Sequence, residues 1–232
     1  MNRLKLRLLG LLYPNRCGCC QCRIEPDRLV CDTCAAELRD LRADYAAWEQ
    51  QNRGTVYPWD GAAAAFLYQG AAKEGVLSLK DGLRNFGDFA GEQLAEIIRS
   101  DPQFSGITCV TWVPVTAQRR RAQGYAHAEI IGKAAAKALG LPARGGLLTE
   151  HAGKLRQHQV SGAERAQYSE RFRHTAKNLN GQSILLTDDV LTSGSTLRQC
   201  TVLLKNCGAA RVFIAAATLR LRTPDLHGSQ TE

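Results

Sequence analysis

The stretch Ile184–Thr196, ILLTDDVLTSGST, decides the fold class of this chain. An apolar run is followed by two adjacent acids, Asp188 and Asp189, and then by a loop of small hydroxylated residues around Gly194. We predict a buried strand over Ile184–Asp188 and a helix over Ser195–Asn206. Because strands and helices alternate from residue 106 onward, the sequence predicts an α/β protein with a parallel, doubly wound sheet.

The same stretch predicts a ligand site. In such a sheet, ligands bind beyond the carboxyl ends of the strands, where Asp188 and Asp189 are expected. The backbone amides, helix dipole and hydroxyls of the following loop suit a phosphate group. This loop consists of Thr192, Ser193, Gly194, Ser195 and Thr196. The two carboxylates suit sugar hydroxyls or Mg²⁺, so we expect a phosphorylated sugar; the alternative is an ordinary strand–turn–helix with capping residues.

Composition and charge set the broad class. The chain has 232 residues, of which 44% are hydrophobic, as expected for a globular protein. A net charge of +8 favours an anionic partner such as phosphate or nucleic acid. No apolar run reaches the roughly 18 residues that a membrane span needs. We interpret the N-terminal MNRLKLRLLGLLYP as a short amphipathic helix of a cytoplasmic protein, since Arg7 interrupts its apolar run and no small-residue cleavage site follows.

Six of the nine cysteines crowd into one N-terminal segment. The pairs Cys19/Cys22 and Cys31/Cys34 each have the C-x2-C spacing of a zinc knuckle, which predicts a closed, structural Zn²⁺ site. Cys17 and Cys20 form a competing C-x2-C pair, so the first half of the ligand set stays open. The alternative is a group of reduced thiols without metal.

The remaining pattern predicts the order of elements and two domains. Residues 1–50 are expected to hold the N-terminal helix, the zinc knuckle and a following helix over residues 35–48 capped by Asp32 or Thr33; residues 51–232 form the α/β domain. A polar linker is expected over Glu49–Pro58. We predict strands over residues 61–70, Gly106–Val115 and Val212–Leu219, and helices over residues 71–82, Gly87–Ser100 and Ile130–Leu139, with a mobile loop and a short helix over residues 149–170.

The stretch ILLTDDVLTSGST resembles the phosphoribosyl-diphosphate signature of the type I phosphoribosyltransferases. The resemblance implies that Asp188 and Asp189 contact the ribose hydroxyls. It also implies that Thr192 through Thr196 hold the 5′-phosphate.

Together with the cysteine segment, the chain resembles the ComF family of competence protein F and GntX-like proteins, which are tied to DNA uptake and utilisation. In PVTAQRRRAQGYAH, the residues Pro114, Arg119, Gly124 and the aromatic Tyr125 match that family's pattern, whereas Gln123, Ala126 and His127 depart from it. Further on, Gln157 and Arg165 fit the pattern, while Tyr168 stands where an Asn is usual. Lys80 matches a lysine near the start of the family's domain.

The resemblance implies that phosphoribosyl diphosphate binds with Mg²⁺ and loses its diphosphate from C1 of the ribose. Cations stabilise that leaving group, and Arg119, Arg120 and Arg121 are the candidates, with a solvated basic loop as the alternative. We therefore assign catalytic roles to Asp188, Asp189 and Arg119, and ligand binding to Lys80 and Arg165 as well. Residues 150–165, with Lys154, Arg156 and Arg165, are expected to close over the ligand. His127, His151 and His158 are expected to face solvent or to form hydrogen bonds.

Three functions remain open from the sequence. The first is a phosphoribosyltransferase acting on an unidentified nucleophile, and the second is a sensor that binds phosphoribosyl diphosphate without catalysis. The third is an accessory factor that binds single-stranded DNA or competence proteins. The aromatic content of 6% and the lack of an obvious stacking platform weigh against a dedicated single-strand binder.

Overall fold

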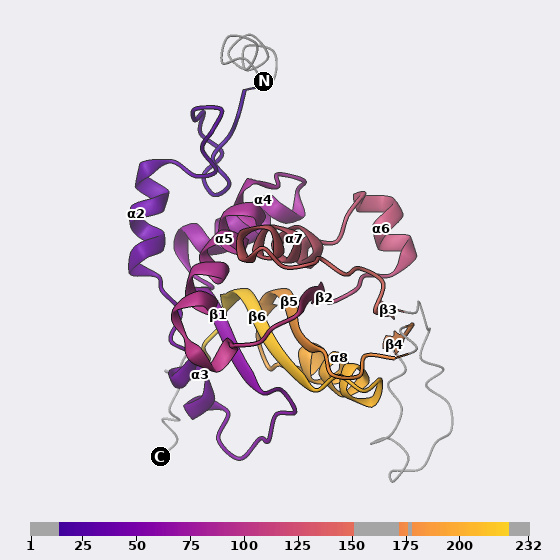
Figure 1. Ribbon diagram of the computed structural model, residues 1–232. Coiled ribbons are helices and arrows are strands. Elements are labelled where there is room, and N and C mark those ends of the chain that lie inside the picture. Colours follow the sequence, from indigo (N-terminus) through magenta and orange to yellow (C-terminus); the bar gives the residue numbers. More distant parts are fainter. Residues whose placement is uncertain (1–13, 151–171, 176–177, 223–232) are drawn as a thin grey trace, which may run out of the picture.

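The computed structural model describes residues 14–150, 172–175 and 178–222, apart from the side chains of residues 119 and 123 (Figure 1). The expected amphipathic helix at the N-terminus and the expected loop and short helix within residues 151–170 lie outside this part. Of the helices that are described, none has the length and apolar character that crossing a bilayer requires.

A four-stranded parallel sheet forms the centre of the molecule. Its strands are β1 (Gly61–Leu67), β2 (Cys109–Trp112), β5 (Ser183–Leu191) and β6 (Arg211–Leu219), in the order β1-β6-β5-β2. Figure 1 shows helices on both faces: α4 (Gly70–Lys80), α5 (Asn85–Ser100) and α7 (His127–Leu139) cover one, and α8 (Ser195–Asn206) covers the other. The predicted α/β class with a doubly wound parallel sheet is confirmed.

Alternating side chains of the central strands fill two separate cores. On β6, Phe213 and Ala215 pack into the core beneath α4, α5 and α7, whereas Val212 and Ile214 pack into the core beside α8. All four are almost fully buried. A strand buried on both faces reads as a continuous apolar run, which explains why VFIAAATL identified β6 so clearly.

The single helix expected over residues 35–48 is wrong. The structure has α2 (Asp32–Asp40), capped by Cys31, and α3 (Tyr45–Gln51), capped by Asp44. Between them the backbone pairs with the free edge of β1: the Ala43 N–H donates to the Ala65 carbonyl at 3.2 Å, and the Leu67 N–H donates to the Leu41 carbonyl at 2.7 Å. Covering a sheet edge outweighs local helix propensity here. The N-cap of α2 is therefore Cys31, and not Asp32 or Thr33 as expected.

Three strands differ by more than one residue from the predicted bounds: β1 ends at Leu67 and not at residue 70, β2 is shorter than predicted and β5 is longer. β2 pairs with β5 only from Cys109 to Trp112, opposite Ile184 to Thr187. On its other side β5 continues to pair with β6 as far as Leu191. Asp188 and Asp189 therefore lie within β5, at the point where its β2 neighbour has ended, and this leaves that side of the strand open.

A small antiparallel pair was not foreseen from the sequence. β3 (Leu148–Glu150) pairs with β4 (Phe172–His174), with Leu148 opposite His174 and Glu150 opposite Phe172. These strands flank residues 151–171, so they bring the two ends of that segment together. The short helices Pro102–Phe104 (3₁₀) and α6 (Ala117–Gln123) complete the described elements.

The cysteine segment packs directly on α4 and α5. The Ser78 hydroxyl donates to the Cys19 carbonyl at 3.1 Å, and the Asn85 amide donates to the Arg16 carbonyl at 2.7 Å. A Cβ on Gly18 would lie 2.4 Å from the Phe86 nitrogen, so only glycine allows this approach. Cys17, Cys19 and Cys34 share a hydrophobic core with Leu79 and Phe86.

Candidate functional site

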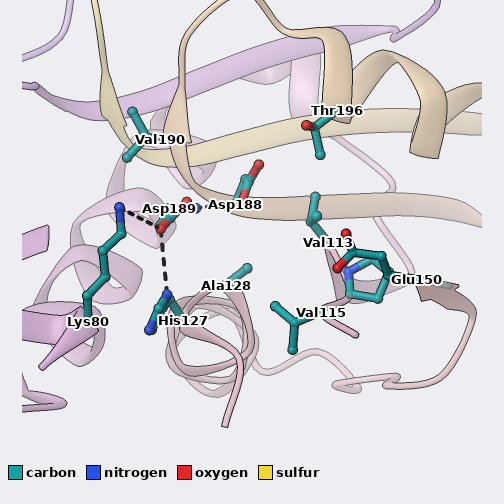
Figure 2. A pocket seen from close by; sticks show the side chains of 11 residues that line it. Lys80, Val113, Val115, His127, Ala128, Glu150, Asp188, Asp189, Val190 and Thr196 are labelled. Carbon is teal, nitrogen blue, oxygen red and sulfur yellow. Dashed lines mark hydrogen bonds and ion pairs between the residues drawn. The ribbon is translucent and has the colours of Figure 1, made fainter. Parts of the chain in front are cut away.

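A cavity of about 380 Å³ opens where β2 ends beside β5 (Figure 2). It draws residues from α4, the end of β2, the start of α7, β3, β5 and α8. Its lining consists of Lys80, Val113, Pro114, Val115, His127, Ala128, Glu150, Asp188, Asp189, Val190 and Thr196. Of the residues proposed from the sequence, the cavity therefore brings together both acids, Lys80 and Thr196.

Asp189 lies between two basic side chains. Its Oδ2 is 3.9 Å from Lys80 Nζ and 3.8 Å from His127 Nδ1, and the two contacts reach it from α4 and α7 (Figure 2). The Thr218 hydroxyl donates to the Asp189 carbonyl at 3.0 Å, which fixes the backbone against β6. The Asp189 N–H donates to Asp188 Oδ1 at 2.9 Å.

The loop after β5 leaves a helix end open for an anion. α8 begins at Ser195, its N-cap residue Gly194 has φ = 73°, and no described side chain caps it. The first N–H groups of a helix have no acceptor within the helix, and they carry the positive end of the helix dipole. Thr196, in this first turn, points its side chain into the cavity.

The other loop residues face elsewhere. Ser193 and Ser195 line a second cavity of about 440 Å³, whose other residues include Tyr57, Arg198 and Arg222. Their hydroxyl oxygens are 3.3 Å apart. Thr192 is exposed and lines neither cavity. Its carbonyl accepts a hydrogen bond from the indole N–H of Trp48.

Aromatic residues support this loop, a feature that the sequence analysis missed. Trp48 of α3 is 1% exposed, and its indole Nε1–H donates to the Thr192 carbonyl at 2.7 Å. A Cβ on Gly194 would lie 3.0 Å from the Trp59 ring and 3.3 Å from the Tyr57 ring. Tyr57 and Trp59 stack with ring centroids 4.3 Å apart. The only sequence signal was a group of aromatics in and beside a stretch interpreted as a linker.

The proposed diphosphate cations are only partly placed. The Arg120 guanidinium lies 2.8 Å from Glu129, a buried carboxylate that also pairs with Lys133 at 2.8 Å. Arg120 lines a cavity of about 490 Å³ that shares Pro114, Val115 and Glu150 with the first one. Arg121 is exposed. The Arg119 side chain lies outside the described part of the chain, as do Arg165, Gln157, Lys154, Arg156, His151 and His158.

His127 and Glu150 are cavity residues that the sequence did not single out for ligand binding. His127 is the first residue of α7, and its side chain is 13% exposed. Thr187 helps to hold this helix end, because its hydroxyl is 3.2 Å from the carbonyls of both Thr111 and Ala128. Glu150 comes from β3, at one end of residues 151–171.

The cysteine sulfurs gather into two groups, each with all of its sulfur atoms within 4.8 Å of one another. One group contains Cys17, Cys20, Cys22 and Cys31, and the other contains Cys17, Cys19 and Cys34. The set expected from the sequence, Cys19, Cys22, Cys31 and Cys34, is therefore divided between the groups. Clusters of this composition can hold a metal ion.

The thiols differ in how their surroundings treat a negative charge. Burial opposes ionisation of Cys17, but hydrogen bonds from the N–H groups of Cys31 and Cys19 outweigh it and lower its pKa to about 6. Burial raises the pKa of the Cys19 and Cys34 thiols, and the neighbouring thiols raise it further. The cluster therefore favours few thiolates at once unless a cation joins it.

Known proteins are similar to the C-terminal part of this chain. Residues 128–227 match the phosphoribosyl transferase domain family. An adenine phosphoribosyltransferase of Pseudomonas paraeruginosa is 37% identical over 102 residues, which cover 43% of this chain and 53% of the relative. That of Pseudomonas aeruginosa is 36% identical over the same length and shares. The chain thus spans about half the length of these curated relatives.

Solved structures of phosphoribosyl-handling enzymes also align with the chain. A glutamine phosphoribosylpyrophosphate amidotransferase from B. subtilis gives a TM-score of 0.42 at 19% identity, covering 62% of this chain and 27% of that one. A purine phosphoribosyltransferase from Pyrococcus horikoshii gives a TM-score of 0.33 at 18% identity, covering 60% of this chain and 79% of that one.

The match to the domain family covers several of the elements that line the cavity. Residues 128–227 contain most of α7, all of β5, the loop Thr192–Thr196, α8 and β6. Residues 128–227 therefore carry the match to the phosphoribosyl transferase domain, within an α/β fold built on a parallel sheet.

Proposed function

We propose that this protein binds phosphoribosyl diphosphate in the 380 Å³ cavity. Asp188 and Asp189 accept hydrogen bonds from the ribose hydroxyls, while the Thr196 hydroxyl and the backbone N–H groups of the loop Thr192–Thr196 and the first turn of α8 hold the 5′-phosphate. The observation that carries the proposal is the meeting of both acids, Thr196 and Lys80 in one cavity, six of whose eleven lining residues lie within the span that matches the phosphoribosyl transferase domain.

The same cavity suits a Mg²⁺ ion bound with the ligand. Mg²⁺ prefers oxygen ligands and is commonly held by one or two carboxylates together with substrate phosphates. Asp188, Asp189 and Glu150 supply carboxylates in the cavity wall. When bound, the ion neutralises charge on the departing diphosphate.

We further propose that the protein transfers the phosphoribosyl group. The bond from C1 of the ribose to the diphosphate oxygen breaks, the diphosphate leaves with the electron pair, and a nucleophile bonds to C1 and loses a proton. Arg119 and Arg165 are the proposed diphosphate cations. Arg120 assists from the adjoining cavity once its ion pair with Glu129 opens.

On the basis of the resemblance to the ComF family, we propose that this activity serves DNA uptake and utilisation. We propose that Zn²⁺ holds the N-terminal segment together. The structure supports Cys17, Cys20, Cys22 and Cys31 as its ligands, because these four sulfurs lie in one group. In this proposal residues 1–50 form a metal-bound unit docked on the phosphoribosyltransferase-like domain of residues 51–232.

One observation favours an accessory role with single-stranded DNA. The 440 Å³ cavity is lined by Arg198, Arg222, Asn52, Gln199 and four hydroxyl side chains, and no acid is among the described residues that line it. Such a surface suits the phosphates of a nucleic acid. Binding there would fall steeply as the salt concentration rises.

Isothermal calorimetry with phosphoribosyl diphosphate and Mg²⁺ tests the main proposal, and a diphosphate-release assay against a panel of nucleobases tests the transfer. Binding with base-dependent diphosphate release supports a transferase. Binding without release against any base supports a sensor. Salt-sensitive binding of single-stranded DNA, without binding of phosphoribosyl diphosphate, supports the accessory role and overturns the main proposal.

A further inference from the structure

The cysteine segment contains more sulfur than one metal ion uses. Six thiols form the two groups described above, and Cys17 belongs to both of them. A single tetrahedral zinc ion takes four ligands, so a site built on Cys17, Cys20, Cys22 and Cys31 leaves Cys19 and Cys34 unused. These two are not scattered, because both lie within 4.8 Å of Cys17 and of each other.

One edge of the four-thiol group has the length expected for a metal-bound tetrahedron. The sulfurs of Cys20 and Cys31 are 3.7 Å apart. A Zn–S bond of about 2.3 Å sets the sulfur–sulfur edge of a regular tetrahedron at roughly 3.8 Å. The group is half open to solvent, since Cys20 and Cys22 are exposed.

Backbone N–H groups point at two sulfurs of the four-thiol group. Cys17 Sγ accepts from the N–H of Cys31 at 3.3 Å and from the N–H of Cys19 at 3.5 Å. Cys31 Sγ accepts from the N–H of Cys34 at 3.5 Å, at the start of α2. Such donors stabilise ligand thiolates. Cys17, the sulfur common to both groups, receives two of them.

The three-thiol group is a different environment. Cys17, Cys19 and Cys34 are 0%, 3% and 5% exposed, and they pack in the hydrophobic core under α4 and α5. A soft cation that prefers sulfur is stable in such surroundings, whereas Mg²⁺ or Ca²⁺ is not. A charged metal–thiolate centre at this point would join the cysteine segment to the core of the main domain.

We propose that the segment binds two soft metal ions, with Cys17 as the bridging thiolate. Cys17, Cys20, Cys22 and Cys31 hold the first ion, and Cys17, Cys19 and Cys34 hold the second. The proposal rests on the proposed zinc site, because it adds a second position to it. It is independent of phosphoribosyl diphosphate.

Cadmium titration of the full chain counts the positions. Metal-free, reduced protein is titrated with Cd²⁺ without oxygen, the thiolate-to-metal charge-transfer band is followed in the ultraviolet, and native mass spectrometry gives the number of ions bound. We expect two equivalents for the wild type and one for the Cys19→Ser/Cys34→Ser variant. The control Cys207→Ser, a half-buried cysteine far along the chain, keeps two.

The wild-type count decides the question even if the double variant fails to fold. One equivalent in the wild type means that the two groups are alternative ligand sets for a single ion, which overturns the second position and leaves the zinc proposal standing. No bound metal overturns both. Two equivalents that persist in a folded Cys19→Ser/Cys34→Ser variant place the second ion elsewhere and also overturn the inference.

Discussion

At the scale of single residues, the most informative feature is the setting of Asp189. The sequence predicted two acids beside a phosphate loop, an arrangement that is repulsive unless the acids serve another group. The structure places Lys80 of α4 and His127 of α7 against Asp189 of β5, and the Lys80 ammonium offsets part of the charge of this carboxylate. These contacts hold its oxygens in place for the ribose hydroxyls of the proposed ligand, as preorganised sites require.

Asp189→Asn is expected to weaken the binding of phosphoribosyl diphosphate by roughly ten- to a hundredfold, because a hydrogen bond to a charged group contributes about 1.5–3 kcal/mol. Ribose 5-phosphate, which carries the same hydroxyls, should lose a similar factor. Calorimetry with both ligands measures the effect, and Asp40→Asn, an exposed acid on α2, serves as the control. Unchanged affinity for both ligands in the folded variant would reduce the motif to a strand–turn–helix.

Thr196→Val tests the phosphate end of the cavity. The substitution keeps the shape of the side chain and removes its hydroxyl, which lines the cavity in the first turn of α8. A lost hydrogen bond to phosphate predicts a roughly tenfold or greater drop in affinity for phosphoribosyl diphosphate and ribose 5-phosphate alike. Inorganic diphosphate is the comparison ligand. An equal drop for diphosphate would place the lost contact away from the 5′-phosphate.

At the scale of elements, the sequence predicted what local pattern and burial control. The pattern of apolar residues predicts β6 and α8. Gly140, whose φ is 70°, marks the end of α7. The break between α2 and α3 was not predicted, because the pairing of Leu41–Ala43 with β1 joins residues far apart in the sequence. The β3–β4 pair was not predicted either, because a strand of three residues is too short to show a recognisable pattern.

The site residues divide in the same way, into those that a local motif reveals and those that only the fold brings together. Asp188, Asp189 and the loop Thr192–Thr196 form one contiguous stretch, and a short motif can reveal them. His127, Glu150 and Trp48 reach the site through the fold, from three other elements. No periodicity links such residues to the motif, and only the three-dimensional structure brings them together.

At the scale of elements, the prediction concerns Trp48 of α3. Trp48→Phe keeps an aromatic ring in the core but removes the N–H that holds the Thr192 carbonyl at 2.7 Å. A net loss of about 0.5–1.5 kcal/mol in loop positioning predicts a several-fold weaker affinity for ribose 5-phosphate. Amide hydrogen exchange in residues 192–196 should quicken as well.

Tyr45→Phe is the matched control for this prediction. The Tyr45 hydroxyl accepts from the Trp59 indole N–H at 3.0 Å and not from the loop, and the substitution keeps every aromatic ring. Removing this hydroxyl should therefore cost stability without changing the affinity per folded molecule. If both variants weaken ligand binding equally, the aromatic residues support the loop only through packing.

At the scale of the whole molecule, the cysteine segment and the cavity are connected through α4. The segment contacts α4 through the hydrogen bond from Ser78 to Cys19, and it shares a core with Leu79. The next residue, Lys80, reaches Asp189 in the cavity. The Tyr125 hydroxyl also donates to the Leu79 carbonyl at 3.2 Å, which ties the start of α7 to the same turn. The order of the cysteine segment thus bears on the position of Lys80, a cation proposed to bind the ligand.

Removing the proposed metal ion is therefore expected to act at two places. A chelator strong enough to strip the cysteine cluster should lower the melting temperature of the entire domain, because Cys17, Cys19 and Cys34 belong to a core shared with Phe86. A loss of about 2 kcal/mol corresponds to roughly 4–8 °C for a chain of this size. It should also weaken phosphoribosyl diphosphate binding several-fold, since the end of α4 loosens and Lys80 with it.

Lys80→Gln separates the two effects: this variant should start with weaker binding and lose no further affinity on chelation, while its melting temperature falls as in the wild type. An equal chelator-induced loss of affinity in Lys80→Gln would mean that the metal reaches the cavity by another route, and an unchanged melting temperature in both proteins would mean that the cluster does not stabilise the shared core.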